Sequence, residues 1–197
     1  MDAILKYFQE NRGYALMSEM KARGFQTRSI QKLVETGRIA KVKPGVYRLT
    51  DMKFDESNGL VEVSLAIPKA VICLSSALAF HDLTTFVPTA ITYAIPRSDK
   101  PIKLFHPPTE AFYFSAAQYK AGVEHIETKS GQIVIYGTEK TICDCFRFSS
   151  RLGDDIAMEG LKAYLRSPSR DLNKLMKFAE ICRVKGALTQ YVKAIVG

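Results

Sequence analysis

The hydrophobic and polar positions between residues 24 and 37 repeat with helical periodicity. Ile30, Leu33 and Val34 follow the i, i+3, i+4 spacing of one buried stripe. Thr27 is suited to capping the start of this helix, because its hydroxyl can accept a hydrogen bond from an unpaired backbone N–H group. Gly37 is suited to ending the helix, because glycine adopts the left-handed C-cap conformation at little cost. The pattern therefore predicts a helix of about three turns.

Two β-rich runs follow this helix directly and predict a hairpin. They lie on either side of residues 43–45, Lys-Pro-Gly, where Pro presets the φ angle of one turn residue and Gly tolerates the conformation of the next. Polar side chains occupy the helix face away from the apolar stripe, and three of them suit a phosphate or a base edge: Arg28, Gln31 and Lys32. A helix with such a face, followed by a short basic hairpin, is typical of a winged helix-turn-helix domain.

Two shorter helices are predicted before this pair of elements. Ile4, Leu5 and Phe8 form an apolar stripe in the first, and the second is expected from about Leu16 to Lys21. Residues 1–50 are therefore predicted to fold as a winged helix-turn-helix DNA-binding domain. The polar, acidic segment 51–58 is predicted to be a linker.

The predicted DNA-binding domain offers six candidate contacts. In helix-turn-helix proteins the N-terminal part of the recognition helix reaches the base edges, which points to Arg28, Gln31 and Lys32. Arg can pair with guanine and Gln with adenine, whereas Lys more often binds phosphate. The alternative for each basic residue is an ordinary solvated surface charge. The candidates for phosphate or minor-groove contacts, on the hairpin and just before it, are Arg38, Lys41 and Lys43.

Residues 59–197 are predicted to form a larger mixed α/β domain. A helix is expected from near Ser75, and from Thr138 onward the chain is expected to be helical, with Gly153 and Gly186 separating successive helices. The fold class predicted for the whole chain is α+β. Its small sheet is expected from four β-type runs, at 91–96, 102–106, 112–115 and 132–137.

Charge is distributed unevenly along the 197 residues, whose formal net charge is +8. Residues 1–50 hold 10 Lys and Arg against 4 Asp and Glu, whereas residues 51–150 hold 9 against 11. Concentrated positive charge attracts phosphate polymers and speeds their encounter. Since the excess lies in the quarter of the chain with the helix-turn-helix pattern, we expect double-stranded DNA as a partner. The alternative is a basic surface that only keeps the protein soluble.

Patterns of catalytic and metal-binding residues are sparse. The four cysteines, of which two are Cys143 and Cys145, show neither a disulfide framework nor Cys-x-x-Cys spacing. This pair could indicate redox chemistry, but it fits better as small buried hydrophobic side chains. Lys140 and Asp144 could be part of a nuclease site, but their i, i+4 spacing fits a salt link on a helix surface. The phosphate-binding loop, the nucleophile elbow and the zinc-protease motif are absent from the sequence, so we expect no catalytic residue, metal or cofactor.

Two further features allow both a functional and a structural interpretation. His81 could be catalytic, but it suits the end of a helix, where a cation complements the helix dipole. The aromatic side chains of residues 112–114 and Tyr119 could stack on bases, but β-alternation fits a strand that is half core and half surface.

The sequence also predicts the compartment. No apolar run approaches the ~20 residues that span a bilayer, and the N-terminal MDAILKYFQENRGY turns polar too early for a signal peptide. We therefore expect a reduced, cytoplasmic protein without a membrane partner.

Several segments resemble the AbiEi-type antitoxins, the transcriptional regulators of phage-defence (abortive infection) type IV toxin–antitoxin operons. The run GRIAKVKPGVYRL after a basic helix is similar to the N-terminal domain of that family. The runs CLSSALAFHDLT, ITYAIP and YGTEKTICDCFRFSSRLGDDIAMEGLKAYL are similar to its C-terminal antitoxin domain. Together they cover nearly the whole chain in family order, and the last run is the most specific because it is long and matches in both pattern and position.

The resemblance implies an antitoxin and autorepressor with two activities. The N-terminal domain would bind inverted repeats in its own operon, and residues 59–197 would neutralise a nucleotidyltransferase-like toxin. Lys140, Arg147 and Arg151 lie in the most family-like run and are expected to form a functional basic surface. Two alternatives remain open: a stand-alone winged-helix repressor whose body binds a small effector or dimerises, and a nuclease with a winged head.

Overall fold

The computed structural model describes residues 2–52 and 55–196 of the chain. It contains helices and two sheets, in agreement with the predicted α+β class. The chain forms two compact units. The first consists of Met1–Pro68, Ile102–Pro108 and Glu127–Ile133, and the second of Lys69–Pro101, Thr109–Ile126 and Val134–Gly197. The domain boundaries at residues 50 and 59 stay predictions, because each compact unit is assembled from several segments of the chain.

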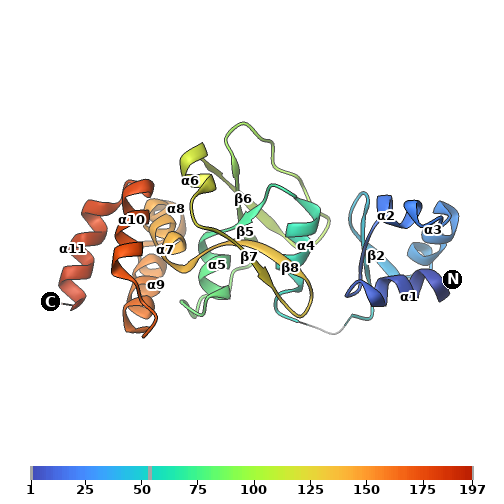
Figure 1. Ribbon diagram of the computed structural model, residues 1–197, viewed down its shortest axis with the longest axis horizontal. Helices are drawn as coiled ribbons and strands as arrows, with labels where there is room; N and C mark the ends of the chain where they lie inside the picture. The colour runs from blue at the N-terminus through green and yellow to red at the C-terminus, as the bar shows by residue number, and fades with distance from the viewer. Residues whose placement is uncertain (1, 53–54, 197) are drawn as a thin grey trace. The chain divides into compact units, whose positions relative to one another are not determined.

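The N-terminal part of the first unit contains three helices, labelled in Figure 1, and a three-stranded antiparallel sheet. In this sheet β3 lies between β1 and β2. One apolar core, which includes Phe8, Met20 and Ile39, joins the helices to the sheet. We call residues 2–49 the head. Its elements are α1 (Asp2–Glu10), β1 (Tyr14–Leu16), α2 (Met17–Ala22), α3 (Thr27–Glu35), β2 (Ile39–Lys43) and β3 (Val46–Leu49).

Gly37 ends α3 as the sequence predicts. Its N–H donates to the carbonyl of Val34 at 3.0 Å, and the next N–H, of Arg38, donates to the carbonyl of Leu33 at 2.9 Å. These paired bonds form a Schellman motif, which requires a left-handed residue, and Gly37 has φ +67°. Gly24 ends α2 in the same way, with φ +82°.

The start of α3 differs from the prediction. Gln26 occupies the N-cap position and no side chain caps the helix. Thr27 is already the first residue of the helix, so the capping role expected of its hydroxyl is wrong.

The hairpin between β2 and β3 forms where the sequence predicts it. Pro44 and Gly45 make the connection, and Gly45 has φ +87°. The register shifts near the turn, which marks a β-bulge in β2. One carbonyl of this edge strand is paired outside the sheet: Val42 accepts a hydrogen bond of 3.1 Å from the N–H of Phe105, which belongs to the same unit.

A buried carboxylate ties α4 (Asn58–Ala66) to the head within the first unit. Glu62 is 4% exposed, and its Oε1 lies 3.3 Å from Arg48 Nε on β3. The same oxygen accepts a hydrogen bond of 3.4 Å from the Tyr14 hydroxyl on β1. Burial raises the pKa of Glu62, and the Arg48 charge opposes that shift. The segment predicted as a linker thus runs into a helix that already begins at Asn58, its last residue.

The second sheet has five strands in the order β6-β5-β4-β8-β7. β5 is parallel to β6 and antiparallel to β4, whereas β4 is parallel to β8. This is a mixed sheet, as predicted. Its strands are β4 (Val71–Ile72), β5 (Ile91–Pro96), β6 (Thr109–Phe114), β7 (Val123–Glu127) and β8 (Gln132–Tyr136).

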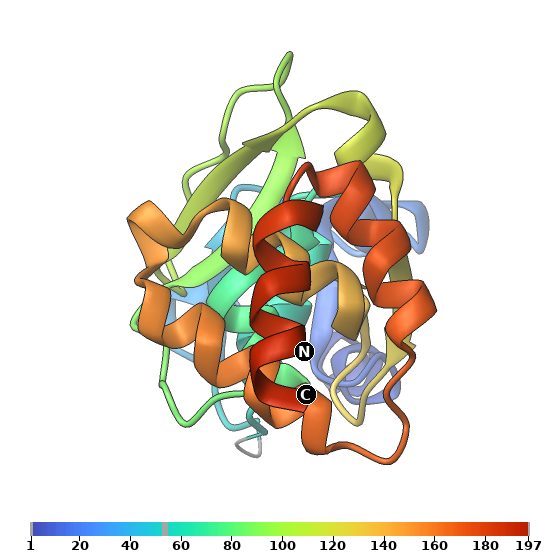
Figure 2. The same ribbon diagram turned by 90° about the vertical axis from the view of Figure 1, so that its left-hand side faces the viewer.

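Most helices of the second unit lie in its C-terminal part, where α10 and α11 run alongside each other (Figure 2). The central one is α7, which packs against α5, α9 and α10 and buries every residue from 139 to 145. The helices of this unit are α5 (Leu74–Phe80), α6 (Ala116–Lys120), α7 (Thr138–Arg147), α8 (Ser149–Leu152), α9 (Asp154–Arg166), α10 (Leu172–Cys182) and α11 (Lys185–Val196).

Some local predictions are wrong. The run 102–106 forms no strand, and β1, β4 and β7 were not expected. Gly186 lies inside α11, so it does not separate the last two helices; the chain turns instead at Arg183, which has φ +62°.

Other local predictions are confirmed. Gly153 separates α8 from α9. The expected alternation on β6 is also present, because Phe112 and Phe114 are buried and Tyr113 is 42% exposed.

Gly37→Ala tests the requirement for a left-handed residue after α3. A Cβ at Gly37 would meet no atom within 4 Å, so the substitution isolates the cost of the positive φ. We expect the free energy of unfolding, measured with urea, to fall by about 1 kcal/mol.

Gly186→Ala is the matched control for this test. It also places a Cβ in open space, but inside α11 and outside the left-handed region. We expect it to raise the free energy of unfolding by up to about 1 kcal/mol. The same loss in both variants would contradict the account of Gly37.

Candidate functional site

The polar face of α3 is exposed on the head. Arg28, Gln31 and Lys32 are all exposed, and their i, i+3, i+4 spacing places them on one side of the helix. The other side carries Ile30 and Leu33, which are completely buried. The apolar core therefore fixes which way the polar face points.

The basic residues of the hairpin lie next to this helix, because β2 packs against α3. Arg38 is exposed and stands directly before β2. Lys41 is exposed and Lys43 is half-buried near the turn. All six residues singled out for DNA contact thus lie on α3, on β2 or in the connection between them.

The five basic members of this group carry unbalanced charge. In the described part of the chain, none of them forms an ion pair: Arg28, Lys32, Arg38, Lys41 and Lys43. Some other basic residues of the first unit are paired, such as Arg12, which lies 2.8 Å from Glu127. Exposed cations without carboxylate partners keep their charge available for an anionic polymer.

The prediction that Lys140 contributes to a basic surface in the second unit is wrong. Its side chain is fully buried in α7 and forms an ion pair with Asp144, which is fully buried as well. The Lys140 ammonium also lies 4.2 Å from the ring centroid of Tyr136 and 4.8 Å from that of Phe114. Burial raises the pKa of Asp144, and the charge of Lys140 opposes that shift. The pair is therefore an interior ion pair rather than the expected surface salt link.

Arg147 and Arg151 lie in different surroundings. The Arg147 side chain is 16% exposed, and its Nη1 is 3.7 Å from Asp144 Oδ1. Arg151 is exposed and paired with Glu110 at 2.5 Å. Because Lys140 is buried and Arg151 is neutralised, the three residues do not present one continuous basic surface.

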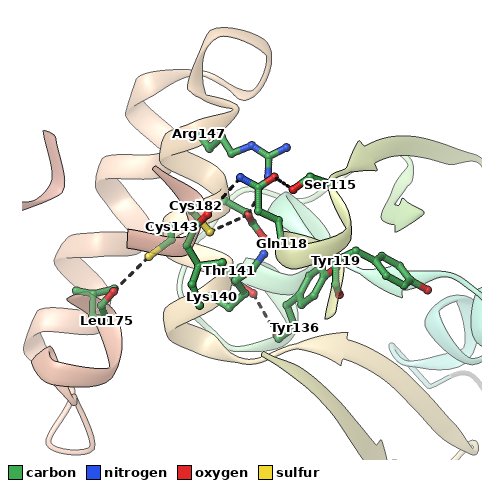
Figure 3. Close-up of polar contacts among 12 residues, drawn as sticks. Ser115, Gln118, Tyr119, Tyr136, Lys140, Thr141, Cys143, Arg147, Leu175 and Cys182 are labelled. Carbon is green, nitrogen blue, oxygen red and sulfur yellow. Dashed lines mark hydrogen bonds and ion pairs between the residues drawn. The ribbon is translucent and has the colours of Figure 1, made fainter. Parts of the chain in front are cut away.

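The cysteines form part of the same interior. All four are free and buried. Cys182 donates its thiol hydrogen to Asp144 at 3.4 Å, and Cys143 donates to the carbonyl of Leu175 at 3.5 Å (Figure 3). Burial raises the pKa of the Cys73 and Cys145 thiols well above their ordinary value. Neutral buried thiols fit packing better than redox chemistry.

Other chemical features of the described chain are few. Nowhere among the described residues do three or more His, Cys, Asp and Glu side chains gather in a way that could hold a metal ion. Across residues 2–52 and 55–196, each helix is too short or too polar to cross a bilayer. His81 caps the C-terminal end of α5, and its Nε2 lies 2.8 Å from the carbonyl oxygen of Tyr136, which places it in a structural contact.

Sequence reasoning missed two residues that the fold places beside Arg147. Arg97 and Arg183 line one pocket together with Arg147, although they stand far apart in the sequence. No local pattern marks them, because each follows the end of a different element.

Comparison with known proteins identifies a similar fold. No family model and no curated protein sequence matches the chain. The structure resembles the crystal structure of the RV2827C protein from Mycobacterium tuberculosis, with a TM-score of 0.57 over 93% of this chain and 77% of that chain. The two sequences are 10% identical, so the similarity concerns the fold alone.

Substitutions in the buried pair test its contribution to stability. Lys140→Met leaves Asp144 without its nearest cation, and Asp144→Asn leaves two cations without their shared carboxylate. We expect each to lower the free energy of unfolding by about 3–5 kcal/mol, because removing one partner of a buried ion pair leaves the other charge buried without compensation. The double variant should lose clearly less than the sum of the two.

The control is Arg151→Gln, which removes one partner of an exposed pair. We expect its effect to be at most about 1 kcal/mol. Strict additivity of the Lys140 and Asp144 substitutions in urea unfolding would show that the two groups do not depend on each other.

Proposed function

We propose that this protein is a DNA-binding transcriptional autorepressor and antitoxin of an abortive-infection toxin–antitoxin operon, acting in the cytoplasm. The observation that carries the proposal is the exposed face of α3. It presents Arg28, Gln31 and Lys32 on one side of a helix that packs against a basic hairpin. The order of three helices and a three-stranded sheet supports the proposal of a winged helix-turn-helix domain, in which α3 would be the recognition helix.

The proposed contacts follow from the chemistry of each side chain. With α3 in the major groove, Arg28 would pair bidentately with guanine and Gln31 with adenine, so these two would read sequence. Lys32, Arg38, Lys41 and the half-buried Lys43 would bind phosphate and position the head. Inverted repeats in the operator would seat two copies of the chain.

The proposed antitoxin activity rests on the resemblance of the later segments to AbiEi-type antitoxins, with a nucleotidyltransferase-like toxin as the partner. Lys140 cannot contact a toxin, because its side chain is completely buried. Its contribution would be to hold α7 in place. Arg147 and Arg151 retain exposed atoms and stay candidates for contact.

A pocket in the second unit favours one alternative, a repressor whose body binds a small effector. The pocket has a volume of about 480 Å³ and is lined by three arginines, Arg97, Arg147 and Arg183. An effector site and an antitoxin surface can coexist in one body, so the two functions are separable by experiment.

Binding of the purified full chain to its own promoter tests the roles within the head. Arg28→Ala and Gln31→Ala should each weaken specific binding by about 1–3 kcal/mol and relax the preference at one base pair. Lys41→Ala should weaken binding to all sequences alike. If about five phosphates are neutralised, the log–log slope of affinity against salt should be about −4 to −5, and Lys41→Ala should reduce its magnitude by about 1.

Lys177→Ala on α10 is the control for this series. Lys177 is exposed and forms no ion pair within the described residues. It should leave both affinity and salt slope unchanged. Binding that is insensitive to salt, or equal losses in all four variants, would rule out the proposed roles.

Co-expression with the neighbouring toxin gene tests the antitoxin activity. The full chain is the right reagent, because a cut at residue 59 would leave Glu62 buried without Arg48 and Tyr14. We expect Arg28→Ala/Lys32→Ala to abolish promoter repression and still rescue growth. Failure of both the wild type and this variant to rescue growth, with repression by the wild type intact, would favour the stand-alone repressor.

A further inference from the structure

A pocket in the second unit gathers arginines from three separate elements. Arg97 follows β5, Arg147 ends α7 and Arg183 follows α10. Figure 3 shows the Arg147 side chain beside the amide of Gln118, which is 7% exposed and also lines the pocket. The volume of about 480 Å³ lies in the range of small-molecule sites.

The charge lining this pocket is not balanced. No carboxylate is among the lining residues, and neither Arg97 nor Arg183 forms an ion pair with the residues described. The carboxylate of Asp144 lies 3.7 Å from Arg147 Nη1, but it already forms an ion pair with Lys140. Two cations therefore share one carboxylate in the interior, which leaves an excess positive charge next to the pocket.

Arg147 has a donor group without an acceptor. Its Nη1 is buried and makes no hydrogen bond to any described residue, since the distance to Asp144 is 3.7 Å. This nitrogen faces Asp144 inside the protein, whereas the Arg147 side chain as a whole is 16% exposed. An anion in the pocket would pair with the exposed part of the side chain and balance the excess charge.

The side of the pocket formed by Arg147 and Gln118 is also preorganised. The Arg147 guanidinium lies 4.7 Å from the ring centroid of Phe114 and 4.4 Å from that of Phe148. The Gln118 side chain is held at both ends: Oε1 accepts from the Ser115 hydroxyl at 2.8 Å, and Nε2 donates to the carbonyl of Ile181 at 3.4 Å. Groups fixed before binding lose little entropy when a ligand arrives.

Arg183 stands at an unusual position for its side chain. Its φ of +62° is the left-handed conformation that ends a helix, where glycine is the usual residue. Glycine would therefore adopt the backbone conformation of residue 183 without strain.

We propose that this pocket binds the phosphoryl group of a small molecule, either free phosphate or the phosphate of a nucleotide. Three guanidinium groups match a group with two negative charges and several acceptor oxygens better than a single carboxylate, because each can pair with oxygens through parallel N–H bonds. The pocket is larger than inorganic phosphate needs, and the Phe146 ring on its wall offers a surface for the rest of a phosphate ester. The proposal goes beyond DNA binding by the head and does not depend on it.

Titration calorimetry on the full chain tests the proposal with inorganic phosphate, pyrophosphate, AMP and ATP as probes. We expect saturable binding of at least one probe with one site per chain. The order of affinity separates the two sources, because a nucleotide site prefers AMP or ATP and a phosphate site prefers the inorganic ions. Arg97→Gln and Arg183→Gly should each weaken that binding at least about tenfold.

The variants are chosen so that folding stays intact. Glycine accepts the φ of residue 183 without strain, so Arg183→Gly should unfold at the same or a higher urea concentration than the wild type. Arg170→Gln, an exposed arginine outside the pocket, is the matched control and should bind like the wild type.

Three results would overturn the proposal. One is the absence of binding for all four probes at millimolar concentration. Another is binding that Arg97→Gln and Arg183→Gly leave unchanged, which would place the ligand elsewhere. The third is a loss of duplex or single-stranded DNA binding in these variants without binding of any small probe, which would assign the pocket to a nucleic-acid backbone.

Discussion

The ion pair of Lys140 and Asp144 is the interaction on which the second unit depends. Both side chains are fully buried in α7, the helix that α5, α9 and α10 pack against. Two charges in such an interior are tolerated only if they remain together and their other contacts are satisfied. The rings of Tyr136 and Phe114 beside the ammonium and the Cys182 thiol on the carboxylate supply those contacts. Both charges lie on α7, so a rotation of this helix would carry them together away from Tyr136, Phe114 and Cys182, which belong to other elements. The need to keep these contacts therefore fixes the orientation of α7.

The two units use basic residues in opposite ways. In the head, the apolar side of α3 is buried and its basic side is left exposed without carboxylate partners, which suits a polyanion that binds at the surface. In the second unit, Lys140 forms a buried ion pair with Asp144. The nearby Arg147, at the edge of a pocket, is only partly neutralised by the same carboxylate. The same residue types would therefore serve the proposed recognition of DNA in one place and the proposed recognition of a small anion in the other.

Sequence reasoning succeeded where the information was local. The end of α3 at Gly37 and the Pro44-Gly45 turn depend on the residues themselves, and both are present. It failed where long-range contacts decide. The run 102–106 has β-forming residues but is not a strand of either sheet, and β4 is only a short segment that two distant strands pair with. The i, i+4 spacing of Lys140 and Asp144 is the same on a helix surface and in a core, so the sequence could not predict that both are buried. The arginine pocket could not be predicted either, because Arg97, Arg147 and Arg183 stand far apart in the sequence and only the fold brings them together.

The central claim is that the exposed face of α3 and the hairpin beside it bind operator DNA. The most direct measurement compares the affinity of the full chain for its own promoter fragment with that for an unrelated duplex of equal length, at physiological salt. The account predicts binding to the promoter at least about 10³-fold tighter, the lower end of the range for specific DNA-binding proteins. Equal affinity for the two duplexes, or no binding to either, would contradict it.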